Sequence, residues 1–260
     1  MAASFYLIIL KTVVSILVVL GLVYISEKNP KIGGLLAGLP LGTGIVIFFY
    51  GIEQGPHFVM QSIPYGISGL VSSLSFVIGF YNGGKYFIKQ PVLHVTSALL
   101  FSLIAFFSVS YFLSLFNITL IVSLLIFIVG VVLATLYLNH IPINKKVTKP
   151  KPTLYTMSFR ALFVTAIILL ITGTAKLMGT QWAGVMASFP TAVCPLLIIL
   201  AYSYKDELYP IVIKTFSYSI STLLVFYLLV LWLFPTMGVY SGTLIAYLVC
   251  FIYTYFLKKI

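Results

Sequence analysis

Two stretches of this chain share a pattern of small residues followed by proline: Gly34-Leu-Leu-Ala-Gly-Leu-Pro40 and Gly184-Val-Met-Ala-Ser-Phe-Pro190. Each stretch lies inside a long apolar segment. Small residues at intervals of four let transmembrane helices approach closely, and a proline removes a backbone hydrogen bond and kinks or breaks its helix. The pair therefore predicts two related units in a membrane, each with an interrupted helix.

The composition supports a membrane location. Of the 260 residues, 61% are hydrophobic and only 7% are charged, and the mean hydropathy is +1.16. Soluble domains contain about 25% charged residues, and a bilayer-spanning helix needs roughly 20 apolar ones. We expect an all-α polytopic membrane protein with about nine transmembrane spans, at residues 4–26, 33–51, 58–81, 91–115, 118–138, 154–176, 181–203, 208–234 and 236–257.

The loop charges predict an orientation in the plasma membrane. The chain has 15 Lys and Arg against 4 Asp and Glu, a formal charge of +11. Alternate loops and the C-terminus contain nearly all of the loop lysines: Lys28, Lys31, Lys85, Lys89, Lys145, Lys146, Lys149, Lys151, Lys205, Lys258 and Lys259. The loops on the opposite side contain only Lys176. Because lysine-rich short loops stay in the cytoplasm, we expect the N-terminus outside and the C-terminus in the cytoplasm.

The similarity between the two halves extends beyond the opening pair. Tyr65-Gly-Ile-Ser68 matches Tyr218-Ser-Ile-Ser221, and Lys11 aligns with Arg160. The fourth and ninth spans coincide without gaps at Pro91/Pro235, Val95/Val239, Ser97/Ser241, Leu100/Leu244, Phe107/Phe251, Tyr111/Tyr255, Phe112/Phe256 and Leu113/Leu257.

These matches predict two four-span units, at 1–116 and 154–260, separated by a linker transmembrane helix at 117–139 and a cytoplasmic linker at 140–153. The extra helix reverses the second unit, which gives an inverted 4+1+4 repeat. Many secondary transporters have inverted repeats and bind substrate near the midplane. Duplication without transport is the alternative.

Candidate site residues follow from the repeated pattern. The expected helix-packing positions are Gly34, Gly38, Gly42, Gly184, Ser188 and Ala192, and the expected helix breaks are at Pro40, Pro190 and Pro195. The expected substrate-binding residues are Thr43, Gln61, Tyr65, Ser188, Thr191 and Tyr218, with Lys11 and Arg160 adding positive potential. The alternative is that the prolines merely kink structural helices and that both cations extend to an interface.

Enzymatic and metal chemistry are not expected. His57, His94 and His140 are far apart, and Cys194 and Cys250 do not form a paired motif. No cofactor is implied. No Asp or Glu lies in the interior of a predicted span, so we expect no buried carboxylate for ion coupling.

The run from Gly34 to Pro40, the turn Gly51-Ile-Glu-Gln-Gly55 and the following span rich in Ser, Tyr and Gly resemble the GlpM-like family of small bacterial inner-membrane proteins. The likeness covers residues 5–113 and, more weakly, the second half. It implies a fused, inverted pair of four-span units. One family member is linked to exopolysaccharide production without a defined activity.

The function we expect is a transporter, either a carrier or a facilitator, for a small polar or anionic solute. Its site would lie between the second, third, seventh and eighth spans. The alternative is a non-transporting subunit or scaffold of an envelope or exopolysaccharide system. The expected partners are the lipid bilayer and a small-molecule solute, with a homo-oligomer left open. Binding to nucleic acid is not expected.

Overall fold

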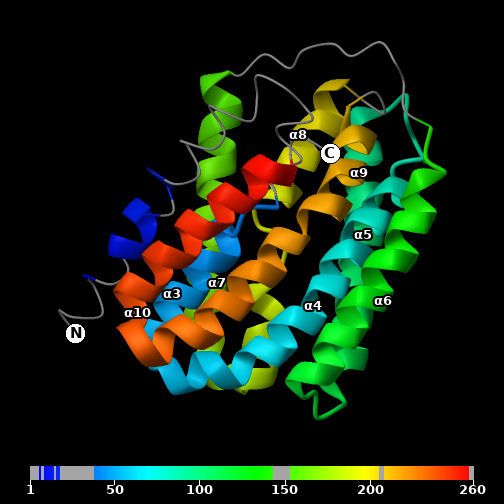
Figure 1. Cartoon of the computed structure of the whole chain (residues 1–260). Helices are drawn as coiled ribbons and strands as arrows, with labels where there is room; N and C mark the ends of the chain where they lie inside the picture. The colour runs from blue at the N-terminus through cyan, green and yellow to red at the C-terminus, as the bar shows by residue number, and fades with distance from the viewer. Residues whose placement is uncertain are drawn as a thin grey trace.

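The computed structural model of the chain describes residues 6, 9–14, 16–17, 38–142, 153–204 and 208–257. All regular elements in these ranges are helices, packed into one bundle (Figure 1). In chain order they are α3 (Leu41–Glu53), α4 (Pro56–Gly83), α5 (Pro91–Ser114), α6 (Leu120–Asn139), α7 (Leu154–Ala187), α8 (Val193–Tyr204), α9 (Tyr209–Ser219) and α10 (Ser221–Leu257).

The predicted class, an all-helical multi-pass membrane protein, is confirmed at this level. Five stretches are long and apolar enough to cross a bilayer: Pro56–Gly83, Pro91–Ser114, Leu120–Asn139, Ala161–Ala187 and Tyr209–Leu257. Apolar side chains also cover the outside of the bundle. On α6, for example, Ile121 is 72% exposed and Leu133 is 62% exposed. Such a surface suits lipid, because soluble monomers rarely expose large apolar patches.

The helices do not correspond one to one with the nine predicted spans. The expected span 181–203 is divided between α7 and α8, and the expected span 208–234 between α9 and α10. Most of the expected span 4–26, and residues 33–37 of the next one, lie outside the described residues.

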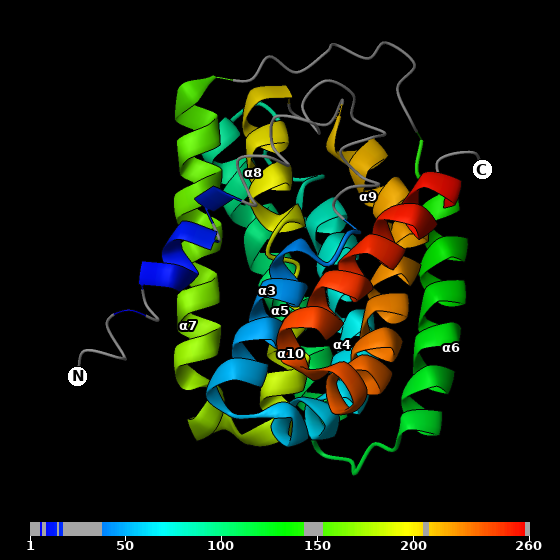
Figure 2. The same ribbon diagram turned by 60° about the vertical axis from the view of Figure 1, so that its left-hand side comes forward.

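Both α7 and α10 contain a sharp turn at a glycine. Gly179 has φ 71° and ψ 173°, and Gly238 has φ 79° and ψ 172°, a backbone conformation that side chains strongly disfavour. In α10 the Tyr253 hydroxyl donates to Ser221 Oγ at 3.2 Å, although the two residues are 32 positions apart. A straight helix would separate them by about 48 Å. Residues 221–237 and 239–257 are therefore two antiparallel legs, visible in orange and red in Figure 2.

Helix α4 lies at the centre of the bundle. Within its most apolar window 78% of the residues are buried, against 17% in α6. It contacts α3, α5, α6, α7, α9 and α10. Gly79 and Gly83 lie against the α5 backbone, where an added Cβ would come within 2.6 Å of the Phe101 and Ser97 carbonyl oxygens.

The C-terminal ends of α4 and α6 meet α9 at one end of the bundle. The Tyr137 hydroxyl, from the end of α6, donates to Asn82 Oδ1 at 2.7 Å, and Lys214 Nζ of α9 donates to the Asn139 carbonyl at 3.3 Å. Lys85 Nζ also donates to Asn82 Oδ1, at 2.9 Å. Lys85 and Lys214 therefore lie at the same end of the molecule.

Candidate functional site

The two proline-containing stretches form two backbone breaks with the same hydrogen-bond pattern. Residues 38–40 form a turn before α3, and residues 188–192 separate α7 from α8. At the first break the Leu41 amide donates to the Leu39 carbonyl at 2.7 Å, and the Gly44 amide donates to the Pro40 carbonyl at 2.7 Å.

At the second break the corresponding bonds are Thr191 to Phe189 at 2.7 Å and Cys194 to Pro190 at 2.8 Å. The residues in the two sets differ by the same offset in the sequence. Pro195 lies in the first turn of α8. A backbone amide at that position would have no acceptor within the helix, so the amide that proline lacks is not needed there.

Hydroxyl groups from neighbouring helices satisfy carbonyls at both breaks. The Tyr247 hydroxyl of α10 donates to the Pro40 carbonyl at 2.8 Å. At the second break the Ser73 hydroxyl of α4 donates to the Ser188 carbonyl. Non-helical backbone at membrane depth needs such partners, because lipid supplies none.

The small residues let the breaks approach their neighbours closely. A Cβ on Gly42 would overlap the Thr191 hydroxyl, so the two breaks touch each other there. A Cβ on Gly38 would overlap Ser219, at the junction of α9 and α10, and one on Gly184 would overlap the Ser62 carbonyl of α4. Gly34 lies outside the described residues.

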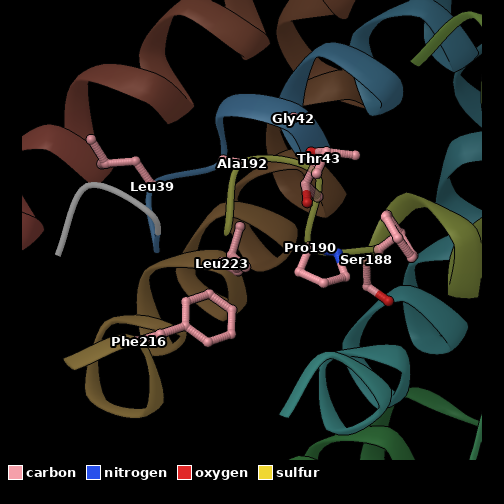
Figure 3. A pocket seen from close by; sticks show the side chains of 10 residues that line it. Leu39, Gly42, Thr43, Ser188, Pro190, Ala192, Phe216 and Leu223 are labelled. Carbon is pink, nitrogen blue, oxygen red and sulfur yellow. The ribbon is translucent and has the colours of Figure 1, made fainter. Parts of the chain in front are cut away.

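A pocket of about 10 Å³, room for about one water molecule, lies between the two breaks. Figure 3 shows its walls coming from α3, from the link between α7 and α8, and from α9 and α10. The lining consists of apolar and hydroxyl residues only: Leu39, Gly42, Thr43, Ser188, Phe189, Pro190, Thr191, Ala192, Phe216 and Leu223.

Two lining hydroxyls lack a partner in the part of the chain that the structure describes. Thr43 is 4% exposed and Thr191 is 3% exposed, and neither side chain hydrogen-bonds a described residue. Ser188 differs, because its hydroxyl donates to the Val185 carbonyl at 2.6 Å.

Backbone amides at the pocket are unpaired as well. Among the described residues, no acceptor is found for the amides of the lining residues Gly42 and Thr43 in α3, or of Ala192 directly before α8. The first amides of a helix have no acceptor within it, and water, caps or ligands satisfy them. The N-termini of α3 and α8 therefore present free donors to one pocket.

Three other predicted binding residues lie away from this pocket. The Tyr65 hydroxyl accepts from Gln181 Nε2 at 3.1 Å and contacts the α5–α6 connection at Ile118, 3.4 Å away. Tyr218 is 49% exposed, and its hydroxyl donates to Asn139 Oδ1 at 3.0 Å. Gln61 is exposed. The match between the two halves of the sequence does not determine which way these side chains face on their helices.

Lys11 does not line the pocket either. It is 4% exposed, and its Nζ lies 2.6 Å from Glu53 Oε1 and 2.8 Å from Thr172 Oγ1, with the Phe49 ring centroid 5.4 Å away. The carboxylate of Glu53, expected at a span end, is thus part of a largely buried ion pair. The Glu53 side chain is 17% exposed and belongs to the last residue of α3, so it lies at a helix end, where the sequence placed it. The side chain of Arg160 lies outside the described residues.

Several pocket residues had no signal in the sequence. Phe216 and Leu223 line the pocket from α9 and α10, yet they resemble any other apolar residue of these spans. Tyr247 is likewise one of 18 tyrosines. Among the described residues, no group of three His, Cys, Asp or Glu side chains could hold a metal ion.

No family model, curated protein or solved structure matches this chain. The resemblance to the GlpM-like family therefore depends on the sequence motifs alone.

Proposed function

We propose that this protein is a membrane carrier or facilitator for a small anionic solute, bound between the breaks before α3 and α8. One observation supports this most directly. Two helix N-termini with unpaired amides, and the unpartnered hydroxyls of Thr43 and Thr191, surround a single buried pocket.

The electrostatics of such a pocket favour an anion. A helix N-terminus behaves as a partial positive charge, and its free amides point toward a ligand. Interrupted helices in transporters use their half-helix N-termini to bind anionic groups near the midplane. Threonine hydroxyls add donors that can rotate toward an anion. Polar groups of this kind are costly in a membrane interior, and are usually functional there.

We further propose the inverted 4+1+4 architecture with nine spans. Its support is the shared hydrogen-bond pattern of the two breaks and the opposite directions of α3 and of residues 180–204 in Figure 2. Of the matching residues, Tyr65 contacts the α5–α6 connection just before α6, the unpaired helix, and Tyr218 contacts its last residue, Asn139. In this proposal the lysine-rich end, with Lys85 and Lys214, faces the cytoplasm, and the two units rock about the pocket.

A second candidate is the non-transporting subunit or scaffold. The small volume of the pocket favours it, because about 10 Å³ is too small for a solute unless the breaks separate. Co-purification of a stoichiometric partner from native membranes, together with no anion flux by the isolated protein, would favour the scaffold.

The test of transport uses purified protein in liposomes and the uptake of chloride, nitrate and formate. We expect uptake above that of protein-free vesicles, lowered about tenfold by Thr43→Val and by Thr191→Val, since a hydrogen bond to a charged group contributes about 1.5–3 kcal/mol. Thr165→Val is the matched control, because Thr165 is 6% exposed with an unpartnered hydroxyl and does not line the pocket.

The proposal fails if the wild-type protein moves none of these anions. It also fails if both pocket variants transport as fast as Thr165→Val.

A further inference from the structure

We infer that the pocket selects monovalent over divalent anions, and that it does so with backbone dipoles and hydroxyls, not with a cationic side chain. This inference rests on the proposed transport function and specifies its substrate class. It comes from the balance of charge around the pocket.

The helix ends at the pocket supply about half a unit of net positive charge. Each helix N-terminus is equivalent to roughly +0.5 of an elementary charge and each C-terminus to roughly −0.5. The N-termini of α3 and α8 meet at the pocket, and the C-terminus of α7 lies beside its lining residues Ser188 and Phe189. Among the described residues that line the pocket, none is ionisable. A monovalent anion would therefore keep about half an uncompensated charge, whereas a divalent anion would keep about one and a half.

Lys11, which the sequence predicted to add positive potential, is already neutralised. Lys11 is paired with Glu53 at 2.6 Å and donates to Thr172 at 2.8 Å. Its ammonium is thus balanced by a carboxylate within the same cluster, and the pair adds little net charge at the pocket.

The narrowness of the pocket strengthens the selection. Because it has room for about one water molecule, the two breaks must separate before an anion fits, and a site opened only that far leaves no room for most of the anion's hydration shell. Moving an uncompensated ion from water into a low-dielectric interior costs several kcal/mol after relaxation. The amides of Gly42, Thr43 and Ala192, with two threonine hydroxyls, replace part of the hydration of a single charge.

Perchlorate and sulfate provide the test, because both are tetrahedral oxyanions of similar size that differ by one charge. Uptake of each into proteoliposomes is measured by ion chromatography of the vesicle contents, with protein-free vesicles subtracted. We expect perchlorate to enter at least about tenfold faster than sulfate, because an uncompensated charge costs more than the free energy of a tenfold change. Thr43→Val should lower perchlorate uptake.

Sulfate uptake equal to perchlorate uptake would overturn the inference and leave the transport function standing. Absence of uptake for both anions, and for chloride, would instead reject transport itself. The ratio of the two rates is also measured in the double variant Lys11→Met with Glu53→Gln. We expect this ratio to be unchanged, and a fall of the ratio to near one would show that the Lys11 charge takes part in selection.

Discussion

At the residue scale, the most unusual feature is a charge pair inside an apolar bundle. The Lys11 ammonium has a carboxylate, a hydroxyl and an aromatic face around it, from Glu53, Thr172 and Phe49. Buried ion pairs are stable only when further polar contacts complete them. The cluster joins residue 11 to the end of α3 and to the middle of α7.

Removing one member of this pair should destabilise the protein more than removing both. Lys11→Met alone leaves the Glu53 carboxylate largely buried without a partner, which costs about 3–5 kcal/mol. In the double variant with Glu53→Gln no charge remains, so much of that loss should be recovered. Unfolding in SDS, monitored by circular dichroism, measures the loss of stability in the single and in the double variant. Equal losses of stability in the single and double variants would mean that the interaction between the two charges does not stabilise the protein.

The contact between Gly42 and Thr191 should depend on their combined volume. Gly42→Ala places a methyl group on the Thr191 hydroxyl, and such overpacking costs about 1–3 kcal/mol. Adding Thr191→Gly removes the obstructing side chain and should restore the unfolding midpoint toward that of Thr191→Gly alone. A double variant as unstable as the sum of the single ones would contradict the contact between the breaks.

At the scale of elements, the sequence predicted the breaks better than the residues around them. Proline and glycine act on their own backbone, so Pro40 and Pro190 indicated where α3 and α8 would have to begin. Which side chains line a pocket depends on helix rotation and on distant helices. Tyr65 and Tyr218 were therefore predicted as site residues, although the Tyr65 hydroxyl contacts the α5–α6 connection and the Tyr218 hydroxyl contacts the last residue of α6. Phe216 had no distinguishing pattern at all.

The hairpin turn of α10 should depend on the absence of a side chain at Gly238. An added Cβ there would meet no atom within 4 Å, so the only penalty of Gly238→Ala is the backbone conformation with φ 79°. We expect a loss of about 1–3 kcal/mol.

Gly173→Ala is the matched control, since Gly173 also has open space around it but lies in regular α7 helix. Alanine there should stabilise the protein by up to about 1 kcal/mol. Thermal unfolding in one detergent compares the two variants. Equal unfolding midpoints for Gly238→Ala and Gly173→Ala would show that a side chain at position 238 does not strain the turn.

At the scale of the whole molecule, α6 is the helix that connects the two halves of the chain. It is the least buried of the five long apolar stretches, at 17% of its apolar window. Tyr65 contacts the connection just before it, and Tyr218 contacts its last residue. An odd crossing of this kind reverses whatever follows it. The orientation of the second half relative to the first therefore depends on α6 spanning the membrane fully.

Side-specific cysteine labelling tests that reversal. In the inverted arrangement Gln54→Cys, between α3 and α4, should react with an impermeant maleimide on intact cells. Asp206→Cys, in the corresponding loop of the second half and outside the described residues, should react only after lysis, as should Lys89→Cys. The native Cys194 and Cys250 are 1% and 0% exposed, so they should contribute little background. Labelling of Gln54→Cys and Asp206→Cys from the same side would mean that the halves run parallel. The two helix N-termini could then no longer face each other across the midplane, and the anion pocket would lose its architectural basis.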